Sequence, residues 1–154
     1  MVARKPAPLF KVKTFVVDAN IVISAMITAG SKAADLLLQP PAQTRFVSCH
    51  FLQIELFKHK SKIQQLSGLD EDSLIELLYE LLSHIEFINE AYIPFDCWDQ
   101  ANQLLKEIDV KDIPYMALAL HLNAPLWTGD RKLTAGLLSR GFDKCVSTSQ
   151  LMAD

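Results

Sequence analysis

The sequence predicts an α/β protein: a three-layer α/β/α sandwich with a mostly parallel central sheet. Short β-branched and aromatic runs alternate with amphipathic segments along the whole chain, without internal repeats or low-complexity tracts. Such alternation is typical of strands joined by crossover helices. Half of the 154 residues are hydrophobic, which is enough for one sizeable core. We therefore expect a flexible basic N-terminal arm over residues 1–13 and a single domain over residues 14–154.

The expected strands are short apolar runs that end at polar or turn residues. The first, TFVV at residues 14–17, has the composition of a central strand buried on both faces. Asp18 follows it directly, and a loop or a short helix comes next. The full set of expected strands comprises residues 14–17, 45–49, 86–89, 125–128 and 145–147.

The expected helices are marked by capping residues and by apolar periodicity. Ser31 can cap a helix that ends before Pro40, and Asp70 or Asp72 can cap a long helix after the break at Gly68. Between the strands these signals recur, with a proline near the start of the helix at residue 114. The expected helices cover residues 31–38, 50–60, 70–85, 95–107, 114–122 and 132–139.

The composition restricts the classes of partner and compartment. A net charge of -3 and a pI near 5.8 provide no overall basic field, so nucleic-acid binding would need a local basic patch. Three widely spaced cysteines form no CxxC pair, which argues against a disulfide framework or a thiolate metal site. The N-terminus lacks the apolar stretch of a signal peptide, and no run approaches the roughly 20 apolar residues of a membrane span. We expect a cytoplasmic protein.

Four acidic residues stand beside apolar segments: Asp18, Glu55, Asp112 and Asp130. Asp18 and Asp130 follow expected strands, and ligands of parallel sheets bind beyond the carboxyl ends of the strands. A carboxylate that loses water on folding needs a cation or hydrogen-bond donors. Each residue alone also has an ordinary explanation, because the three aspartates could cap the helices that follow them and Glu55 could be a hydrated helix position.

Together, the four segments resemble the PIN-domain family of nucleases, which includes the VapC-type toxins of toxin–antitoxin pairs. In that family a hydrophobic strand ends in Asp, any residue and Asn, and a Glu lies on the helix after the second strand. An Asp then opens a helix rich in Ala and Leu, and a later strand ends in Thr, any residue and Asp. The matching segments are VVDAN at 16–20, QIELF at 53–57, DIPYMALAL at 112–120 and WTGD at 127–130. The resemblance covers nearly the whole chain after residue 13.

The resemblance implies that Asp18, Glu55, Asp112 and Asp130 are the catalytic residues and the metal ligands. It implies that they bind Mg²⁺ or Mn²⁺, as one ion or two, and support hydrolysis of phosphodiester bonds in single-stranded RNA. Carboxylate oxygens are the ligands that such hard cations prefer, and a bound cation activates water as a nucleophile. RNA is then the substrate, and the resemblance allows an antitoxin protein and a second copy of the chain as partners.

Three further residues could orient a metal ligand, the attacking water or the substrate: Asn20, Thr128 and Asp109. Asn20 and Thr128 offer an amide and a hydroxyl without adding charge, although loop hydrogen bonding would explain them equally well. Asp109 precedes Asp112 by three residues. Because Pro114 places the start of the helix near Asp112, we expect Asp109 in the loop at the rim of the site.

Three other features have competing explanations. After Asp130 come Arg131 and Lys132, where PIN toxins often have another acid or an aromatic residue, and this departure weakens a second metal position. The basic tract at 58–62 could contact RNA phosphates, but we expect a hydrated helix end. The apolar stripe at 74–85 could join a homodimer or hold an antitoxin, but we expect it to be core.

Two alternative functions stay open at this level. A PIN-like fold could be a catalytically inactive protein- or RNA-binding module, because a sequence does not show whether the acids converge. A haloacid-dehalogenase-like phosphotransferase also has an Asp at the end of its first strand, but it needs a second Asp two residues later, where this chain has Asn20. Divalent-metal titration of the parent and of Asp18→Asn separates a metal enzyme from a binding module.

Overall fold

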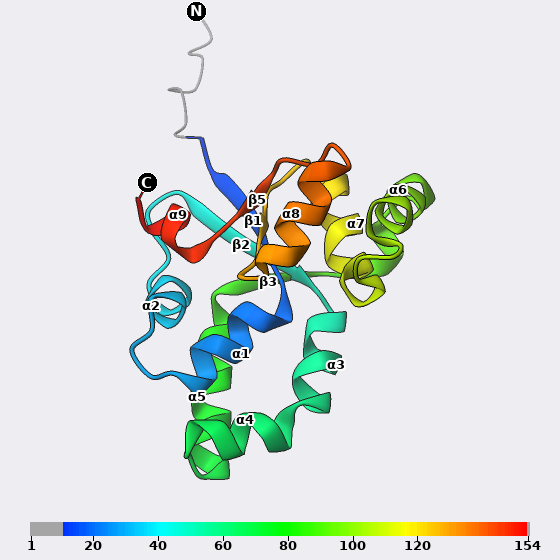
Figure 1. Cartoon of the computed structure of the whole chain (residues 1–154). Helices are drawn as coiled ribbons and strands as arrows, with labels where there is room; N and C mark the ends of the chain where they lie inside the picture. The colour runs from blue at the N-terminus through cyan, green and yellow to red at the C-terminus, as the bar shows by residue number, and fades with distance from the viewer. Residues whose placement is uncertain (1–10, 154) are drawn as a thin grey trace, which may run out of the picture.

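A five-stranded sheet whose paired strands are all parallel forms the centre of the molecule (Figure 1). The computed structural model describes residues 11–153, so most of the expected N-terminal arm, residues 1–10, lies outside the described residues. The strands are β1 Lys13–Val17, β2 Thr44–Cys49, β3 Ile85–Ile88, β4 Leu126–Trp127 and β5 Cys145–Val146. Their order across the sheet is β3-β2-β1-β4-β5, and all five expected strands are confirmed within one or two residues at each end.

Helices join the strands, and every expected helix is confirmed with small shifts at its ends. A short helix follows Asp18, and the basic tract at 58–62 leads into a separate helix that the sequence did not predict. A second unpredicted helix ends the described chain. The helices are α1 Ala19–Ile27, α2 Lys32–Leu38, α3 Phe51–Lys58, α4 Lys60–Ser67, α5 Glu71–Ser83, α6 Phe95–Leu105, α7 Ile113–Leu122, α8 Arg131–Ser139 and α9 Thr148–Ala153, with short 3-10 turns η1 Glu90–Tyr92 and η2 Val110–Asp112.

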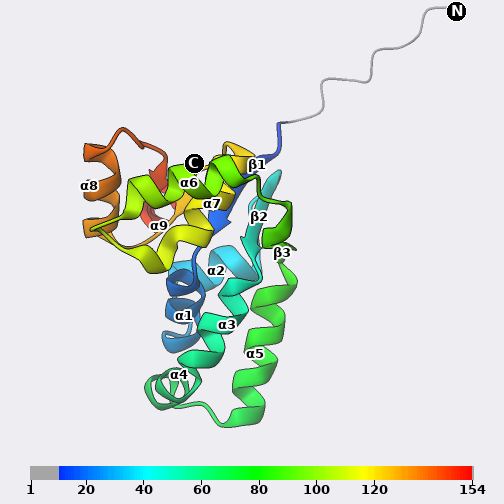
Figure 2. The same cartoon turned by 90° about the vertical axis from the view of Figure 1, so that its right-hand side faces the viewer.

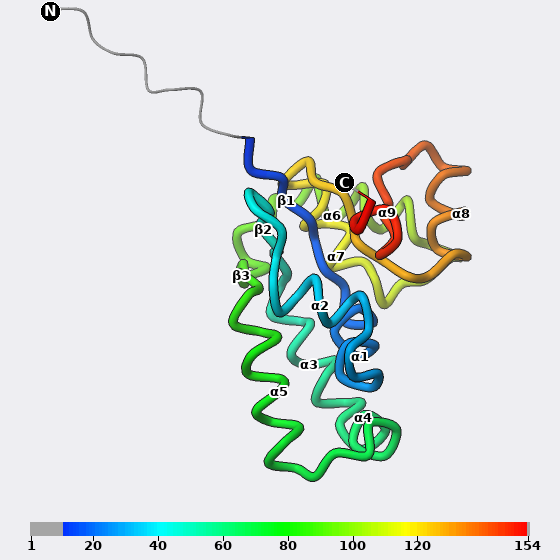
Figure 3. Tube along the Cα trace, turned by 90° about the vertical axis from the view of Figure 1, so that its left-hand side faces the viewer, coloured from blue at the N-terminus to red at the C-terminus, as the bar shows by residue number. Residues whose placement is uncertain are grey.

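The helices cover both faces of the sheet, which confirms the three-layer α/β/α fold. α6 and α7 lie on one face, with α7 packed directly against β1, β2 and β4 (Figure 2). α2 and α9 lie on the opposite face (Figure 3). α1, α3, α4 and α5 extend beyond the carboxyl ends of β1 and β2, as Figure 2 shows.

The central strands are buried as their apolar composition predicts. Val16, Val17 and Val47 have no exposed surface, and the rings of Phe46 and Trp127 lie 5.1 Å apart. Full burial of an apolar side chain of this size contributes about 1.5–3 kcal/mol to folding. The strands therefore give a firm base to the residues at their carboxyl ends.

The helix ends follow the expected capping residues. Ser31 accepts a hydrogen bond from the N–H of Ala34 at 3.2 Å, and Asp70 accepts one from the N–H of Ser73 at 2.8 Å. Gly68 has a φ of 69°, a left-handed conformation that glycine adopts without a steric cost. Local sequence signals thus determine where α2, α4 and α5 begin or end.

The apolar stripe on α5 is only partly core, which corrects the expectation from the sequence. Leu74 and Leu81 are buried, but Leu78 and Leu82 are half-buried and Ile75 is 54% exposed. The periodicity of the stripe predicts an apolar face, and it does not determine which other element covers that face.

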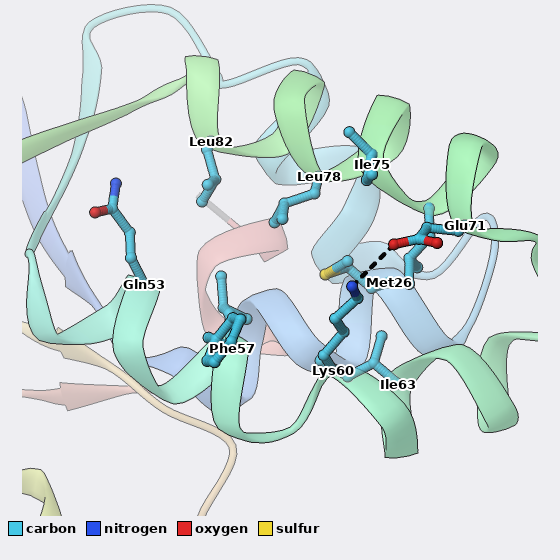
Figure 4. Close-up of a pocket in the computed structure, with 11 residues that line it drawn as sticks. Met26, Gln53, Phe57, Lys60, Ile63, Glu71, Ile75, Leu78 and Leu82 are labelled. Carbon is cyan, nitrogen blue, oxygen red and sulfur yellow. Dashed lines mark hydrogen bonds and ion pairs between the residues drawn. The ribbon is translucent and has the colours of Figure 1, made fainter.

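The partly exposed stripe borders a groove of about 240 Å³, which we call the α3–α5 groove (Figure 4). Its lining is mostly apolar and comes from four helices. An ion pair between Lys60 and Glu71 crosses it, with a distance of 2.9 Å from Nζ to Oε1. The apolar lining residues are Met26 of α1, Leu56 and Phe57 of α3, Ile63 of α4, and Leu74, Ile75, Leu78 and Leu82 of α5.

Within residues 11–153, no single helix combines the length and the apolar character needed to cross a membrane. α1 and α2 meet these two criteria only as a pair, and the chain bends by 108° between them.

Candidate metal centre

The four predicted acids come from separate segments that the fold brings to the carboxyl edge of the sheet. Asp18 lies between β1 and α1, and Asp130 lies between β4 and α8. Asp112 ends η2 and precedes α7, which runs back toward the start of β4 and therefore begins near the carboxyl edge. Glu55 lies on α3, the helix that follows β2.

Asp18 is buried, and one of its carboxylate oxygens has no hydrogen-bond partner. The residue is 2% exposed; its Oδ1 accepts a hydrogen bond from the N–H of Ile21 at 3.1 Å, whereas Oδ2 accepts none. Loss of hydration raises the pKa of Asp18 to about 6, although the nearby Thr128 hydroxyl and the Ile21 N–H lower it in part. A buried oxygen in this state costs free energy unless a cation or a donor approaches it.

Asp112 links the acids into one cluster. Burial raises its pKa to about 8, and the charges of the four other carboxylates add to this effect. Although Asp112 occupies the N-cap position of α7, its side chain makes no capping hydrogen bond. We call Asp112 and the four carboxylates that act on it the acidic cluster; its members are Asp18, Glu55, Asp109, Asp112 and Asp130.

Asp130 and Thr128 form a tight turn after β4. Asp130 Oδ1 accepts a hydrogen bond from the N–H of Leu133 at 3.0 Å, and the Asp130 N–H donates to Thr128 Oγ1 at 3.1 Å. Asp18 and Asp130 therefore do cap the helices that follow them, as the ordinary explanation required. Each cap uses one carboxylate oxygen, so capping leaves the second oxygen of each residue free for another ligand.

Glu55 is held by a tyrosine that sequence reasoning missed. The hydroxyl of Tyr115 donates a hydrogen bond to Glu55 Oε1, and the Tyr115 side chain is fully buried. Tyr115 lies three residues after Asp112, so the two side chains share one face of α7. A polar side chain at this spacing, directly before the Met, Ala and Leu residues of segment 116–120, is the signal that could have identified it.

Glu90 fixes the start of the helix that carries Glu55, and sequence reasoning missed it as well. The Glu90 carboxylate accepts hydrogen bonds from the N–H groups of His50 and Phe51, each at 3.0 Å. These donors are otherwise unpaired groups of the first turn of α3. An acidic side chain from a distant segment thus takes the place of a local N-cap, which no short-range pattern announces.

The other two predicted residues are Asn20 and Asp109, and within the described part of the chain neither side chain makes a hydrogen bond to one of the four predicted acids. The Asn20 side chain is exposed, and its backbone N–H is directed at Asp18. Asp109 is half-buried and accepts a hydrogen bond from the N–H of Lys111 at 3.0 Å. Asp109 thus lies in the loop before α7, as expected, and its charge reaches Asp112.

The loop that carries Asp109 and Asp112 is braced against α8. Arg140 Nη1 donates hydrogen bonds to the carbonyl oxygens of Leu104 at 2.9 Å and Lys106 at 2.6 Å, at the end of α6. A Cβ on Gly136 would lie 2.9 Å from Ile108 Cδ1, so this glycine permits the close approach of the loop. The two contacts connect the segment before Asp112 to the helix that follows Asp130.

Exposed basic side chains follow two of the predicted acids, Asp130 and Glu55, along the chain. Arg131 and Lys132 are exposed in the first turn of α8, directly after Asp130. In the basic tract at 58–62, Lys58 lies over the Phe51 ring at 5.9 Å, and Lys60 pairs with Glu71. The tract continues into α4 and is not a plain helix end.

The donor set of the acidic cluster fits a hard divalent cation, although the side chains do not enclose one. Within residues 11–153, no three Asp, Glu, His or Cys side chains are arranged to hold a metal ion in the positions shown. The cluster offers carboxylate oxygens alone, and one of them, Asp18 Oδ2, is buried without a partner. A cation would offset the burial of the Asp112 carboxylate and neutralise the repulsion that adds to the rise of its pKa. Binding would therefore require the carboxylates to draw together.

Comparison with known proteins identifies a family model that covers the acidic cluster. A model described as PIN domain matches residues 16–149. No curated protein matches the chain.

Several solved structures share the fold. PAE2754 from Pyrobaculum aerophilum is 17% identical with a TM-score of 0.63, over 93% of this chain and 92% of that chain. VapBC-1 from nontypeable Haemophilus influenzae is 18% identical with a TM-score of 0.63, over 88% of this chain and 98% of that chain. VapBC2 from Rickettsia felis, bound to a DNA fragment from their promoter, is 16% identical with a TM-score of 0.62, over 87% and 96%. At these identities the similarity establishes the three-dimensional arrangement alone.

Proposed function

The chain belongs to the PIN-domain family, and from this membership we propose that it is a divalent-metal-dependent endoribonuclease that hydrolyses phosphodiester bonds in single-stranded RNA. The observation that carries the proposal is the buried, unpartnered Oδ2 of Asp18 within a cluster where burial and the neighbouring charges raise the pKa of Asp112. A buried carboxylate with a purely structural role would have hydrogen-bond partners for both oxygens, whereas the cap at Asp18 engages Oδ1 alone. Membership in this family also removes the reason for the phosphotransferase alternative.

Asp18, Glu55, Asp112 and Asp130 would hold one or two Mg²⁺ or Mn²⁺ ions. When bound, such an ion activates water for attack on the phosphate and offsets the charge that develops on the phosphate. Asp112 stays protonated at neutral pH in the free protein because its pKa is about 8, so it must release a proton when it becomes a ligand.

The neutral polar residues would position groups at this site without adding charge. The Thr128 hydroxyl lies close enough to Asp18 to lower the pKa of that carboxyl, and it fixes the backbone of Asp130. The exposed Asn20 follows Asp18 by two residues and the charge of Asp109 acts on Asp112, so their amide and carboxylate could orient water or the ribose-phosphate backbone. Arg131 and Lys132, exposed beside Asp130, are suited to contact RNA phosphates.

We further propose that the protein acts in the cytoplasm as the toxin of a toxin–antitoxin pair and that the α3–α5 groove binds the antitoxin. Structural neighbours include a toxin–antitoxin complex from Klebsiella pneumoniae, 21% identical with a TM-score of 0.56, besides the VapBC complexes. The groove is apolar and open, which suits the apolar face of an amphipathic helix. A second copy of the chain, bound through the same groove in a homodimer, is the alternative partner.

The test of the nuclease proposal is cleavage of end-labelled single-stranded RNA by the full chain with Mg²⁺, Mn²⁺ or EDTA. Cleavage should require the cation and should be lost in Asp18→Asn and Asp130→Asn, while both variants keep the far-ultraviolet circular dichroism of the parent. Asp143→Asn, at an exposed position outside the cluster, is the matched control. RNA binding without cleavage under all metal conditions would instead establish a binding module.

The partner proposal is tested on the groove itself. Ile75→Asp places a charge on the exposed rim of the α3–α5 groove and should leave RNA cleavage intact. The same change should abolish inhibition of RNA cleavage by an antitoxin that binds this groove. If Ile75→Asp instead converts a dimer into a monomer in sedimentation experiments, the groove is a homodimer surface.

A further inference from the structure

We propose that Tyr115 is a positioning residue that holds the Glu55 carboxylate in place for the metal ion. The inference rests on the proposed function, because it concerns the orientation of one of the four proposed ligands. It adds a residue that the acidic pattern does not contain and that bears no charge.

The contact between Tyr115 and Glu55 joins two elements that are far apart in the sequence. The Tyr115 hydroxyl on α7 donates a hydrogen bond to Glu55 Oε1 on α3, sixty residues away. The Tyr115 ring also packs against Phe51 of α3, with ring centroids 6.0 Å apart and planes tilted by 52°. Because the tyrosine has no exposed surface, its hydroxyl is fixed by the packing around the ring.

Glu55 needs such support more than the aspartates that cap helices. Asp18 and Asp130 each have one oxygen anchored by a backbone N–H, and their short side chains have two rotatable bonds. Glu55 has a longer side chain on a half-buried helix face, and the oxygen that is anchored depends on the side chain of Tyr115. Loss of that hydroxyl frees the carboxylate to turn toward water.

The backbone beneath Glu55 is already restrained. Glu90 caps the first turn of α3 through the N–H groups of His50 and Phe51. The remaining freedom is therefore in the side chain of Glu55, which is where Tyr115 acts. Burial and the neighbouring Glu55 raise the pKa of the Tyr115 phenol, so the hydroxyl remains a donor at neutral pH.

The arrangement leaves the second oxygen of Glu55 available. Tyr115 engages Oε1, and no hydrogen bond to Oε2 is formed within the described residues. The same division occurs at Asp18 and Asp130, where one oxygen is committed to the fold. Partners of this kind orient metal ligands, and their removal typically lowers metal affinity by about 10- to 100-fold.

The experiment is a Mn²⁺ titration of the full chain, with free Mn²⁺ measured by electron paramagnetic resonance. Tyr115→Phe keeps the ring and removes the hydroxyl, and it should weaken Mn²⁺ binding by about 10-fold. Tyr79→Phe makes the same change at a position that is 75% exposed, and its affinity should equal that of the parent. Equal or tighter binding by Tyr115→Phe would overturn the inference.

A double-mutant cycle separates positioning from a general structural effect. In the Glu55→Gln background, Tyr115→Phe should change Mn²⁺ affinity by less than about twofold, because the group that Tyr115 positions has already been altered. The same loss in both backgrounds would show that Tyr115 acts through the fold and would overturn the inference. Absence of Mn²⁺ binding by the parent would overturn the proposed function and the inference with it.

A second measurement needs no metal and covers the case in which Glu55→Gln binds too weakly to titrate. With ¹³C-labelled glutamate, the Glu55 carboxyl signal is identified by its absence in Glu55→Gln. Tyr115→Phe should shift this signal and leave the other glutamate carboxyl signals in place. An unchanged Glu55 signal in Tyr115→Phe would contradict the positioning role.

Discussion

The acidic cluster and the α3–α5 groove lie on different sides of the same short helix and pose opposite problems of solvation. In the cluster, the Asp18 and Asp112 carboxylates are removed from water, and Asp18 Oδ2 has no partner. In the groove, apolar side chains such as Ile75 and Phe57 remain in contact with water. A cation stabilises the first arrangement, and an apolar partner stabilises the second. Each region thus indicates the chemistry of what it binds.

The two regions differ in what they contribute to the stability of the fold. The groove has a buried floor that belongs to the hydrophobic core and an exposed rim that does not. The acidic cluster contributes repulsion in the absence of metal, so its residues work against stability while the strands around them support it. Four changes, taken in order of decreasing effect, test this contrast.

The largest effect is expected at the floor of the groove, where two neighbours on α5 differ in burial. Leu74 is 4% exposed and Ile75 is 54% exposed, and both line the groove. Leu74→Ala should lower the free energy of unfolding by about 2–5 kcal/mol, because it opens a cavity in the core. Ile75→Ala should change it by less than about 0.5 kcal/mol. Urea denaturation of both variants measures the difference, and equal losses would show that the rim is as structural as the floor.

Addition of metal should raise the free energy of unfolding of the protein, and this gain should depend on the residues of the cluster and not on those of the groove. At a Mn²⁺ concentration about 100 times the dissociation constant, binding to the folded state alone adds about 2.7 kcal/mol. For a chain of this size that is a rise of several degrees in Tm, which differential scanning calorimetry can follow. The rise should be lost in Asp112→Asn and retained in Ile75→Ala. A rise of the same size in Asp112→Asn would exclude Asp112 as a ligand.

The burial of Asp112 and the repulsion within the cluster should appear as a dependence of stability on pH. The pKa of Asp112 is about 8 in the folded protein and near 3.8 in an unfolded chain, so the folded state keeps a proton that the unfolded state releases between these values. Stability of the metal-free protein should therefore fall as pH rises from about 4 to about 8.

Asp112→Asn should remove most of this dependence and leave the smaller part that stems from Asp18, whose pKa is also raised by burial. It should exceed the parent in stability at pH 8 by at least about 2 kcal/mol, and it should match the parent near pH 4. Urea denaturation at pH 4.5, 6 and 8 in the presence of EDTA provides the comparison. A parent whose stability stays constant over this range would show that Asp112 is not desolvated as described.

The smallest effect is expected for the ion pair that crosses the groove. The Lys60 and Glu71 side chains are 48% and 57% exposed, so water screens their attraction. Lys60→Met should therefore change the free energy of unfolding by less than about 0.5 kcal/mol. The change should nevertheless enlarge the apolar surface of the groove, which increased binding of 8-anilinonaphthalene-1-sulfonate would report. A loss above 1 kcal/mol would mean that the pair closes the groove structurally.

The sequence predicted most of the fold because its signals are local. Strands such as TFVV carry β-branched and aromatic residues, and caps such as Ser31 and Asp70 determine helix ends by bonds within three residues. α4 was missed because the basic residues before it have the composition of a helix end. The partial exposure of the stripe on α5 was not predictable, since periodicity defines a face and tertiary packing decides what covers it.

The acidic residues of the candidate site were predictable from the sequence, but the residues that hold them in place were not. Asp18 and Asp130 attract attention because each follows a strand, and Glu55 and Asp112 were added by resemblance to a family. Their role as metal ligands stays a prediction. Tyr115 acts across 60 residues of sequence through one hydrogen bond and Glu90 across about 40 residues through two, and no periodic pattern encodes contacts of that range.

α3 carries one wall of the groove and one carboxylate of the cluster within eight residues, a rod of about 12 Å. Leu56 and Phe57 immediately follow Glu55 along it. Because Glu55 and Leu56 are consecutive residues of one short helix, a molecule that binds against Leu56 and displaces the helix also displaces Glu55. If that molecule changes the affinity of Glu55 for an ion by some factor, thermodynamic reciprocity requires that the bound ion change the affinity of the protein for that molecule by the same factor.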